Sequence, residues 1–147
     1  MNLREQKAIQ SFKSGLNCAQ SVITAFADDL QFKIDQALGM SVGFGAGMGR
    51  LQETCGAVTG AFMVLGMHNS GMYPDNKEIK EASYTMIQDF SRKFTTVYGT
   101  TNCGSLINCD LKTGEGQLYF RNHNLHEEVC EKCISTSVKI IEDLLKI

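Results

Sequence analysis

The sequence predicts an all-α protein: one domain over residues 1–147, a small helical bundle of about five to six helices with a glycine-rich loop. Three observations predict this fold class. The chain contains one proline, Pro74. No segment alternates β-branched and polar residues over the length of a strand, whereas apolar residues recur at helical spacing. A length of 147 residues with 43% hydrophobic content suits a single domain with its own core.

The first half of the chain contains three predicted helices and a glycine-rich segment. Residues 3–14 form the first helix, because apolar side chains recur there every three or four positions. Asn17 is a good N-cap for a second helix and places Cys18 at its first position. Residues 33–40 form a shorter third helix. Residues 43–50, GFGAGMGR, contain glycines at alternate positions that make a regular helix costly, so we expect a functional loop.

A buried helix follows this segment and begins at Thr54 or just before it. Gly56 and Gly60 lie four residues apart on one face of this helix, where small residues let another backbone approach closely. The apolar stretch 54–67 is shorter than the roughly 20 residues that span a membrane. A long helix is then expected over residues 76–97.

The C-terminal third is predicted to contain a short helix, a loop and a final helix. Asn102 caps the short helix and places Cys103 at its first position. Residues 108–122 are rich in glycine and polar residues and are expected to form the loop. The last helix begins near Asn124, which has capping-box spacing to Glu127.

Charge and the N-terminal sequence limit the expected partners and location. The formal net charge is −2, and the basic residues are spread along the chain, which argues against nucleic acid as a partner. Residues 1–12 lack the apolar core of a signal peptide, so we expect a cytoplasmic protein without a membrane partner. In that reducing compartment, cysteines are more often catalytic, redox-sensing or metal-binding than structural.

Cysteine is the residue type that points to a function. The chain has six, and at least four fall where the sequence predicts the first turns of helices. The unsatisfied N–H groups and partial positive charge of a helix N-terminus stabilise a thiolate and lower its pKa below about 8.5. Cys55 is the leading nucleophile, with Arg50 one turn earlier to favour the thiolate. The alternative is that Cys55 is a small buried residue that fits beside two glycines.

The motifs GLNCAQSV, GFGAGMGRLQETCGAVTGA and TNCGSLINCDL, with a late cysteine before VKIIEDLL, resemble the C_GCAxxG_C_C family of putative redox-active proteins. The resemblance covers nearly the whole chain, from about residue 15 to residue 145. It places the recurring cysteines of the family on Cys18, Cys55, Cys103 and Cys130. Cys109 and Cys133 then look like extra cysteines found in a subset of members. The resemblance implies redox activity and brings no substrate with it.

Three functions remain open from the sequence. In the leading hypothesis, Cys55 and one or more of Cys18, Cys103 and Cys130 cycle between dithiol and disulfide with a redox partner protein, as in a thiol-disulfide oxidoreductase. In the second, the same four cysteines are ligands of zinc or an iron–sulfur cluster. In the third, the chain is a helical interaction domain whose cysteines are buried and inert. Four cysteines allow three pairings, so the sequence does not give the connectivity.

Two further features carry predictions. The predicted cofactor-binding residues belong to the glycine-rich segment and would bring N–H groups to a sulfur, a cluster or an anionic ligand: Gly45, Gly47, Gly49 and Arg50. A tight packing turn explains the same glycines equally well. Cys130 and Cys133 have the C-x-x-C spacing of redox and metal sites, which is weak evidence for one pair alone. The exposed glycine-rich region beside an apolar helix favours a homodimer.

Overall fold

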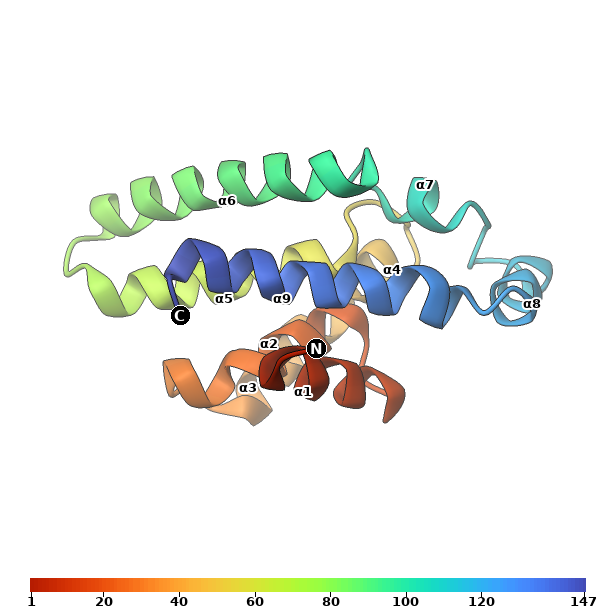
Figure 1. Cartoon of the computed structure of the whole chain (residues 1–147), viewed down its shortest axis with the longest axis horizontal. Helices are drawn as coiled ribbons and strands as arrows, with labels where there is room; N and C mark the ends of the chain where they lie inside the picture. The colour runs from red at the N-terminus through yellow and green to blue at the C-terminus, as the bar shows by residue number, and fades with distance from the viewer.

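The structure, a computed structural model, describes all 147 residues and is helical throughout (Figure 1). Its eight right-handed α-helices are α1 (Leu3–Lys13), α2 (Cys18–Leu30), α3 (Ile34–Ser41), α5 (Gly56–Met72), α6 (Asn76–Tyr98), α7 (Cys103–Ile107), α8 (Gly114–Asn122) and α9 (Lys132–Leu145). A 3₁₀ turn, η1 (Val42–Phe44), precedes the short segment α4 (Gly45–Met48), which contains left-handed residues. A π-helical turn, η2 (His126–Glu131), continues directly into α9. The predicted all-α fold is confirmed, with more helices than five to six.

The helices form three layers (Figure 1). Helices α5 and α9 lie in the middle, α6 covers one side of them, and α1, α2 and α3 cover the other. The largest fully buried side chains come from all three layers and include Phe26, Leu65, Phe90, Phe94 and Ile134. None of the helices combines the length and hydropathy that a membrane-spanning segment needs.

The crossing of α2 and α5 depends on the two glycines that the sequence singled out. A Cβ atom on Gly60 would lie 2.7 Å from the carbonyl oxygen of Ala19, and one on Gly56 would lie 2.9 Å from the Cβ of Cys18. The predicted close approach of another backbone is therefore confirmed. It brings the N-terminus of α2 next to the N-terminus of α5.

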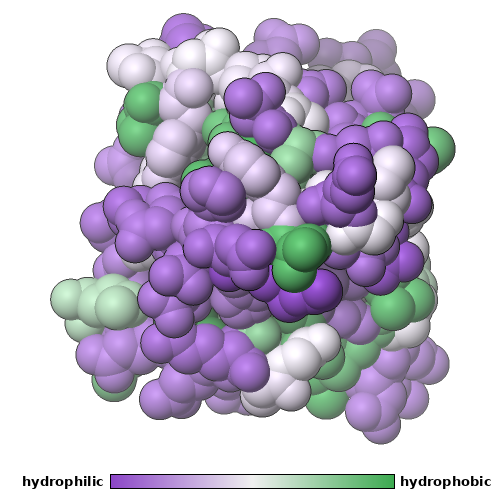
Figure 2. Space-filling model, turned by 90° about the vertical axis from the view of Figure 1, so that its right-hand side faces the viewer, coloured by the Kyte–Doolittle hydropathy of each residue, from purple (hydrophilic) through white to green (hydrophobic).

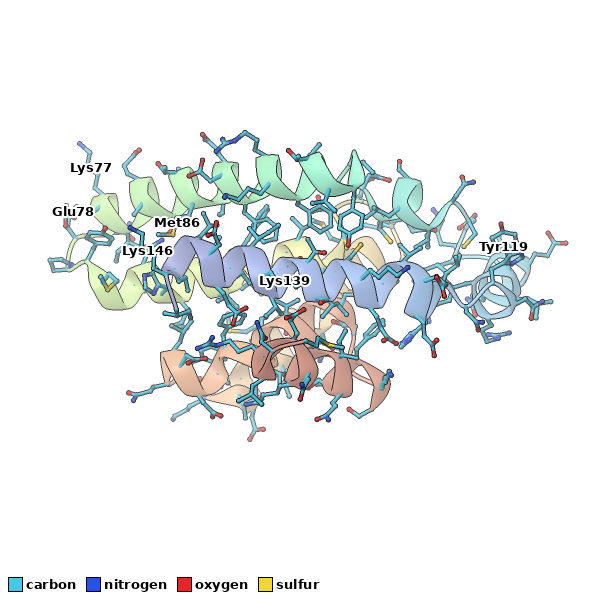
Figure 3. The ribbon with its side chains drawn as sticks, viewed as in Figure 1. Lys77, Glu78, Met86, Tyr119, Lys139 and Lys146 are labelled. Atoms are coloured by element: carbon cyan, nitrogen blue, oxygen red, sulfur yellow. The ribbon has the colours of Figure 1, made fainter.

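A buried carboxylate joins α1 to α9. Glu5 is 3% exposed, and its oxygens accept hydrogen bonds from the Asn2 N–H, at 3.1 Å, and from the Ser135 hydroxyl. Lys139, on the turn of α9 that lies over α1 (Figure 3), brings its Nζ to 3.6 Å from Glu5 Oε1. These contacts fix the N-terminal helix to the last one.

Two predictions about the C-terminal third are wrong. The expected loop 108–122 contains α8, because Thr113 caps a helix there and Gly116 packs directly against the backbone of Asp110. The glycine that suggested a loop serves a close contact instead. The expected capping box at Asn124 does not form, since Asn124 has a left-handed φ of 52° and the π-helical turn begins without a side-chain cap.

Candidate functional site

Five of the six cysteines line one cavity of about 370 Å³. The cavity lies at the end of the bundle formed by α4, α7 and α8 (Figure 1). Tyr119 of α8 marks this end, opposite the start of α6 with Lys77 and Glu78 (Figure 3). The outer surface of this end is mainly hydrophilic, with single hydrophobic residues scattered over it (Figure 2). The cysteines of the cavity are Cys18, Cys55, Cys103, Cys130 and Cys133.

Two asparagine caps position two of these cysteines, as the sequence predicts. Asn17 Oδ1 accepts a hydrogen bond from the Gln20 N–H at 3.0 Å, and Gln20 Oε1 accepts one from the Asn17 N–H. This capping box starts α2 at Cys18. Asn102 caps α7 in the same way and starts it at Cys103. Both side chains therefore enter the cavity from the first residue of a helix.

A short backbone pairing holds Cys55 against the start of α7. Thr54 and Asn102 form an isolated antiparallel bridge. The Cys55 N–H donates to the Thr101 carbonyl at 2.7 Å, and the Cys103 N–H donates to the Glu53 carbonyl at 2.6 Å. The bridge joins segments about 50 residues apart, which the sequence did not predict, and it fixes Cys55 and Cys103 as neighbours.

Cys55 is the N-cap of α5, and its pKa is lowered, as predicted. The main cause is a hydrogen bond from the Cys133 thiol, which outweighs the opposing effect of burial, and the N–H groups of Ala57 and Val58 also donate to the sulfur. Arg50 was expected to favour the thiolate, but its exposed side chain is not among the groups that lower this pKa. The thiolate is stabilised by a neighbouring thiol and by the helix N-terminus.

The same expectation is wrong for Cys18 and Cys103. A hydrogen bond to Cys130, followed by burial, raises the pKa of Cys18 well above its ordinary value. Burial, together with the nearby negative charge of Cys55, raises the pKa of Cys103 to about 12. A helix N-terminus lowers a thiol pKa only where its N–H groups reach the sulfur and desolvation does not dominate. These two side chains are neutral thiols.

The pKa shifts of the cavity thiols pair Cys133 with Cys55 and Cys18 with Cys130. Cys133 donates a hydrogen bond to Cys55, and this contact, with burial, strongly raises the pKa of Cys133. Cys18 donates to Cys130. The sequence suggests that Cys133 is an extra cysteine, whereas in the structure its thiol is the group that lowers the pKa of Cys55 most. The C-x-x-C spacing was the signal that could have identified it, because positions three apart share a helix face.

Two of the four residues predicted in the glycine-rich segment line the cavity. Gly47 and Arg50 line it, whereas Gly45 and Gly49 do not. A Cβ on Gly47 would lie 2.6 Å from the Cβ of Cys103, and one on Gly45 would lie within 2.6 Å of the Asn17 side chain. These contacts support the packing-turn interpretation at both positions.

The remaining wall of the cavity is apolar with a few basic and amide groups. Phe120, Gln117 and Arg121 come from α8, and His126 stacks on Phe12 with ring centroids 3.7 Å apart. No carboxylate lines the cavity. Sequence reasoning missed the α8 residues because it predicted a loop there.

The side chains are not arranged as a metal site. No group of three or more His, Cys, Asp and Glu side chains could hold a metal ion as placed. The ligand roles predicted for Cys18, Cys55, Cys103 and Cys130 therefore stay a prediction.

Comparisons with known proteins cover almost the whole chain. Residues 16–144, which include all six cysteines, match the family described as "Putative redox-active protein (C_GCAxxG_C_C)". An "Uncharacterized protein" of Archaeoglobus fulgidus is 25% identical over 150 residues, which cover 97% of this chain and 93% of the relative. No solved structure matches the chain.

Proposed function

This chain belongs to the C_GCAxxG_C_C family of putative redox-active proteins, and we propose that its cavity is a thiol–disulfide exchange site centred on Cys55 and Cys133. One observation carries the proposal: a cysteine of lowered pKa at a helix N-terminus accepts a hydrogen bond from a second thiol inside a cavity. Such a pair supplies both an attacking thiolate and a resolving thiol.

The proposed reaction proceeds through a mixed disulfide. The Cys55 thiolate attacks one sulfur of a substrate disulfide, forms a bond to it and releases the other sulfur as a thiolate. Cys133 then loses its proton and attacks the Cys55 sulfur, which releases the second substrate sulfur. The substrate disulfide is reduced to two thiols, and two cysteine thiols are oxidised to one disulfide. The N–H groups of Ala57 and Val58 stabilise the attacking thiolate.

The cavity supports a small oxidant as the substrate. Cys55 is 7% exposed and Cys133 is fully buried, so a substrate sulfur must enter the cavity to reach them. Arg50 and Arg121 on the wall, without any carboxylate among the lining residues, favour a substrate that carries negative charge. Three features stay predictions: a cytoplasmic location, a protein redox partner and a homodimer. A reducing compartment would regenerate the dithiol after each reaction.

The test is reaction with oxidised glutathione, a small anionic disulfide. Anaerobically reduced protein should lose the Cys55 and Cys133 thiols, and Cys55→Ser should abolish formation of that disulfide. Cys109→Ser is the matched control, because Cys109 does not line the cavity. Stoichiometric zinc, or iron with sulfide, in the anaerobically purified protein would contradict the proposal. Uniformly slow reaction of all six thiols would instead indicate an inert packing role.

A further inference from the structure

We propose that Cys18 and Cys130 form a second redox-active dithiol, an outer pair that receives the disulfide from Cys55 and Cys133 and passes it to a partner protein. The inference rests on the proposed function, because the inner pair supplies the disulfide that the outer pair receives. It adds a relay between the buried reaction site and the surface of the protein.

The two pairs lie side by side around one cavity. Cys18, Cys130, Cys55 and Cys133 all line the same cavity, and the interaction with Cys130 raises the pKa of Cys18, just as the interaction with Cys133 lowers the pKa of Cys55. A Cβ on Gly56, the residue after Cys55, would lie 2.9 Å from the Cβ of Cys18. Cys130 precedes Cys133 by one turn of the continuous helix formed by η2 and α9. Each member of one pair therefore has a neighbour in the other.

The two pairs differ in exposure, which gives the relay a direction. Cys133 has no exposed surface and Cys55 is 7% exposed, so a folded partner protein has no access to the inner disulfide. Cys130 is half-buried and is the most exposed cysteine of the cavity. A partner dithiol can therefore approach the outer pair at Cys130, while the inner pair exchanges only with small molecules or with neighbouring cysteines.

The transfer between the pairs balances without any other reactant. The Cys130 sulfur, after losing its proton, attacks the Cys133 sulfur and releases Cys55 as a thiolate. The Cys18 sulfur then attacks Cys130 and releases Cys133, which leaves a Cys18–Cys130 disulfide and two inner thiols. The two protons lost by the outer pair balance those gained by the inner pair. A partner protein dithiol then reduces the outer disulfide and becomes a disulfide itself.

The sequence makes this relay directly observable. Trypsin cleaves after Lys132, so Cys130 and Cys133 separate although they are three residues apart. The four cysteines of the relay fall on four different tryptic peptides, residues 14–33, 51–77, 122–132 and 133–139. Reduced protein is mixed with oxidised glutathione, quenched in acid at increasing times, alkylated, digested and mapped by mass spectrometry.

In the wild-type protein, we expect the Cys55–Cys133 link to form first and the Cys18–Cys130 link to replace it. Cys18→Ser should keep the inner link and lose the outer one, and Cys109→Ser should behave as the wild type. Reduction of the oxidised protein by thioredoxin, which is too large to enter the cavity, should be lost in Cys130→Ser, which removes the one cavity cysteine that a partner protein can reach. Dithiothreitol, which is small, should still reduce that variant and thereby show that it is folded and competent.

The failures of the two proposals are distinguishable in the wild-type protein itself. Formation of the inner link without any outer link would overturn the relay and leave the exchange site standing. A Cys130–Cys133 link that accumulates as the final product would also overturn it, since Cys18 would then resolve nothing. Absence of the inner link at all times would contradict the proposed function.

Discussion

The crossing of α2 and α5 offers a quantitative test of the packing that brings the cysteines together. A methyl group on Gly60 would lie 2.7 Å from the carbonyl oxygen and 3.0 Å from the Cα of Ala19. These are backbone atoms of a buried helix, so α2 has to move to make room. Overpacking of this kind costs about 1–3 kcal/mol. Gly60→Ala should therefore lower the free energy of unfolding despite the better helix propensity of alanine.

Gly66→Ala, in the same helix, is the matched control. A Cβ at Gly66 meets no atom within 4 Å. Both substitutions gain about 1 kcal/mol of helix propensity, because alanine replaces glycine in a helix interior. The difference between the two variants therefore isolates the steric cost, and we expect Gly60→Ala to be less stable than Gly66→Ala by about 1–3 kcal/mol.

Urea denaturation of the reduced variants, followed by circular dichroism, measures this difference as a shift in midpoint at constant slope. Equal midpoints for the two variants would refute the close approach of α2 to α5. The same displacement would move Cys18 away from the start of α5, so Gly60→Ala should also slow the appearance of the Cys18–Cys130 disulfide.

Three further predictions follow from the titrating groups. Cys133→Ala removes the thiol that donates to Cys55, so the pKa of Cys55 should rise; a thiolate absorbance titration that shows no rise would contradict the assigned hydrogen bond. Cys103 has a pKa of about 12 when folded and about 8.5 when unfolded, so the folded state keeps a proton that the unfolded state loses, and stability falls as pH rises through this range. At about pH 10 this effect lowers the free energy of unfolding by about 2 kcal/mol, and urea titrations should show that Cys103→Ala lacks this decrease. The same decrease in Cys103→Ala would exclude Cys103 as its cause. Burial raises the pKa of Glu5, but hydrogen bonds from Ser135 and Asn2 outweigh this effect, so the net pKa is lowered. The ionised Glu5 therefore stabilises the folded protein above about pH 4.3, and this contribution is lost as the pH falls. In thermal melts, Glu5→Gln should lose less stability on acidification than the wild type.

Local signals in the sequence were sufficient to predict most of the helices and two of the site positions. Asn17 and Asn102 fix helix starts through their own side chains, a short-range effect that spacing reveals. Gly56 and Gly60 indicated a close helix crossing because small residues four apart have few other uses in a buried helix. The family resemblance itself is confirmed, since residues 16–144 match a family described as putative redox-active proteins.

The features that could not be predicted from the sequence depend on contacts between distant segments. The pKa of Cys18 rises because folding buries it against Cys130, more than 100 positions away, and no local rule contains that neighbour. Helix α8 was missed because Gly116 weakens the local helix signal, while its contact with the Asp110 backbone exists only in the folded chain. The C-x-x-C spacing marks Cys133 in the sequence, but its interaction with Cys55 could not be predicted, because Cys55 lies at the start of another helix.

The glycine-rich segment has an energetically unfavourable backbone conformation next to the cysteine site. Ala46, Gly47, Met48, Gly49 and Arg50 all have positive φ, so this stretch makes a left-handed turn. Each non-glycine residue in that conformation costs about 1–2 kcal/mol, and alternation with glycine limits the total. The turn presses the backbone at Gly47 against the Cβ of Cys103 and leads the chain into the bridge that holds Cys55. The turn and the bridge together place Cys55 and Cys103 on one cavity, so the backbone strain lies directly beside the proposed reaction site.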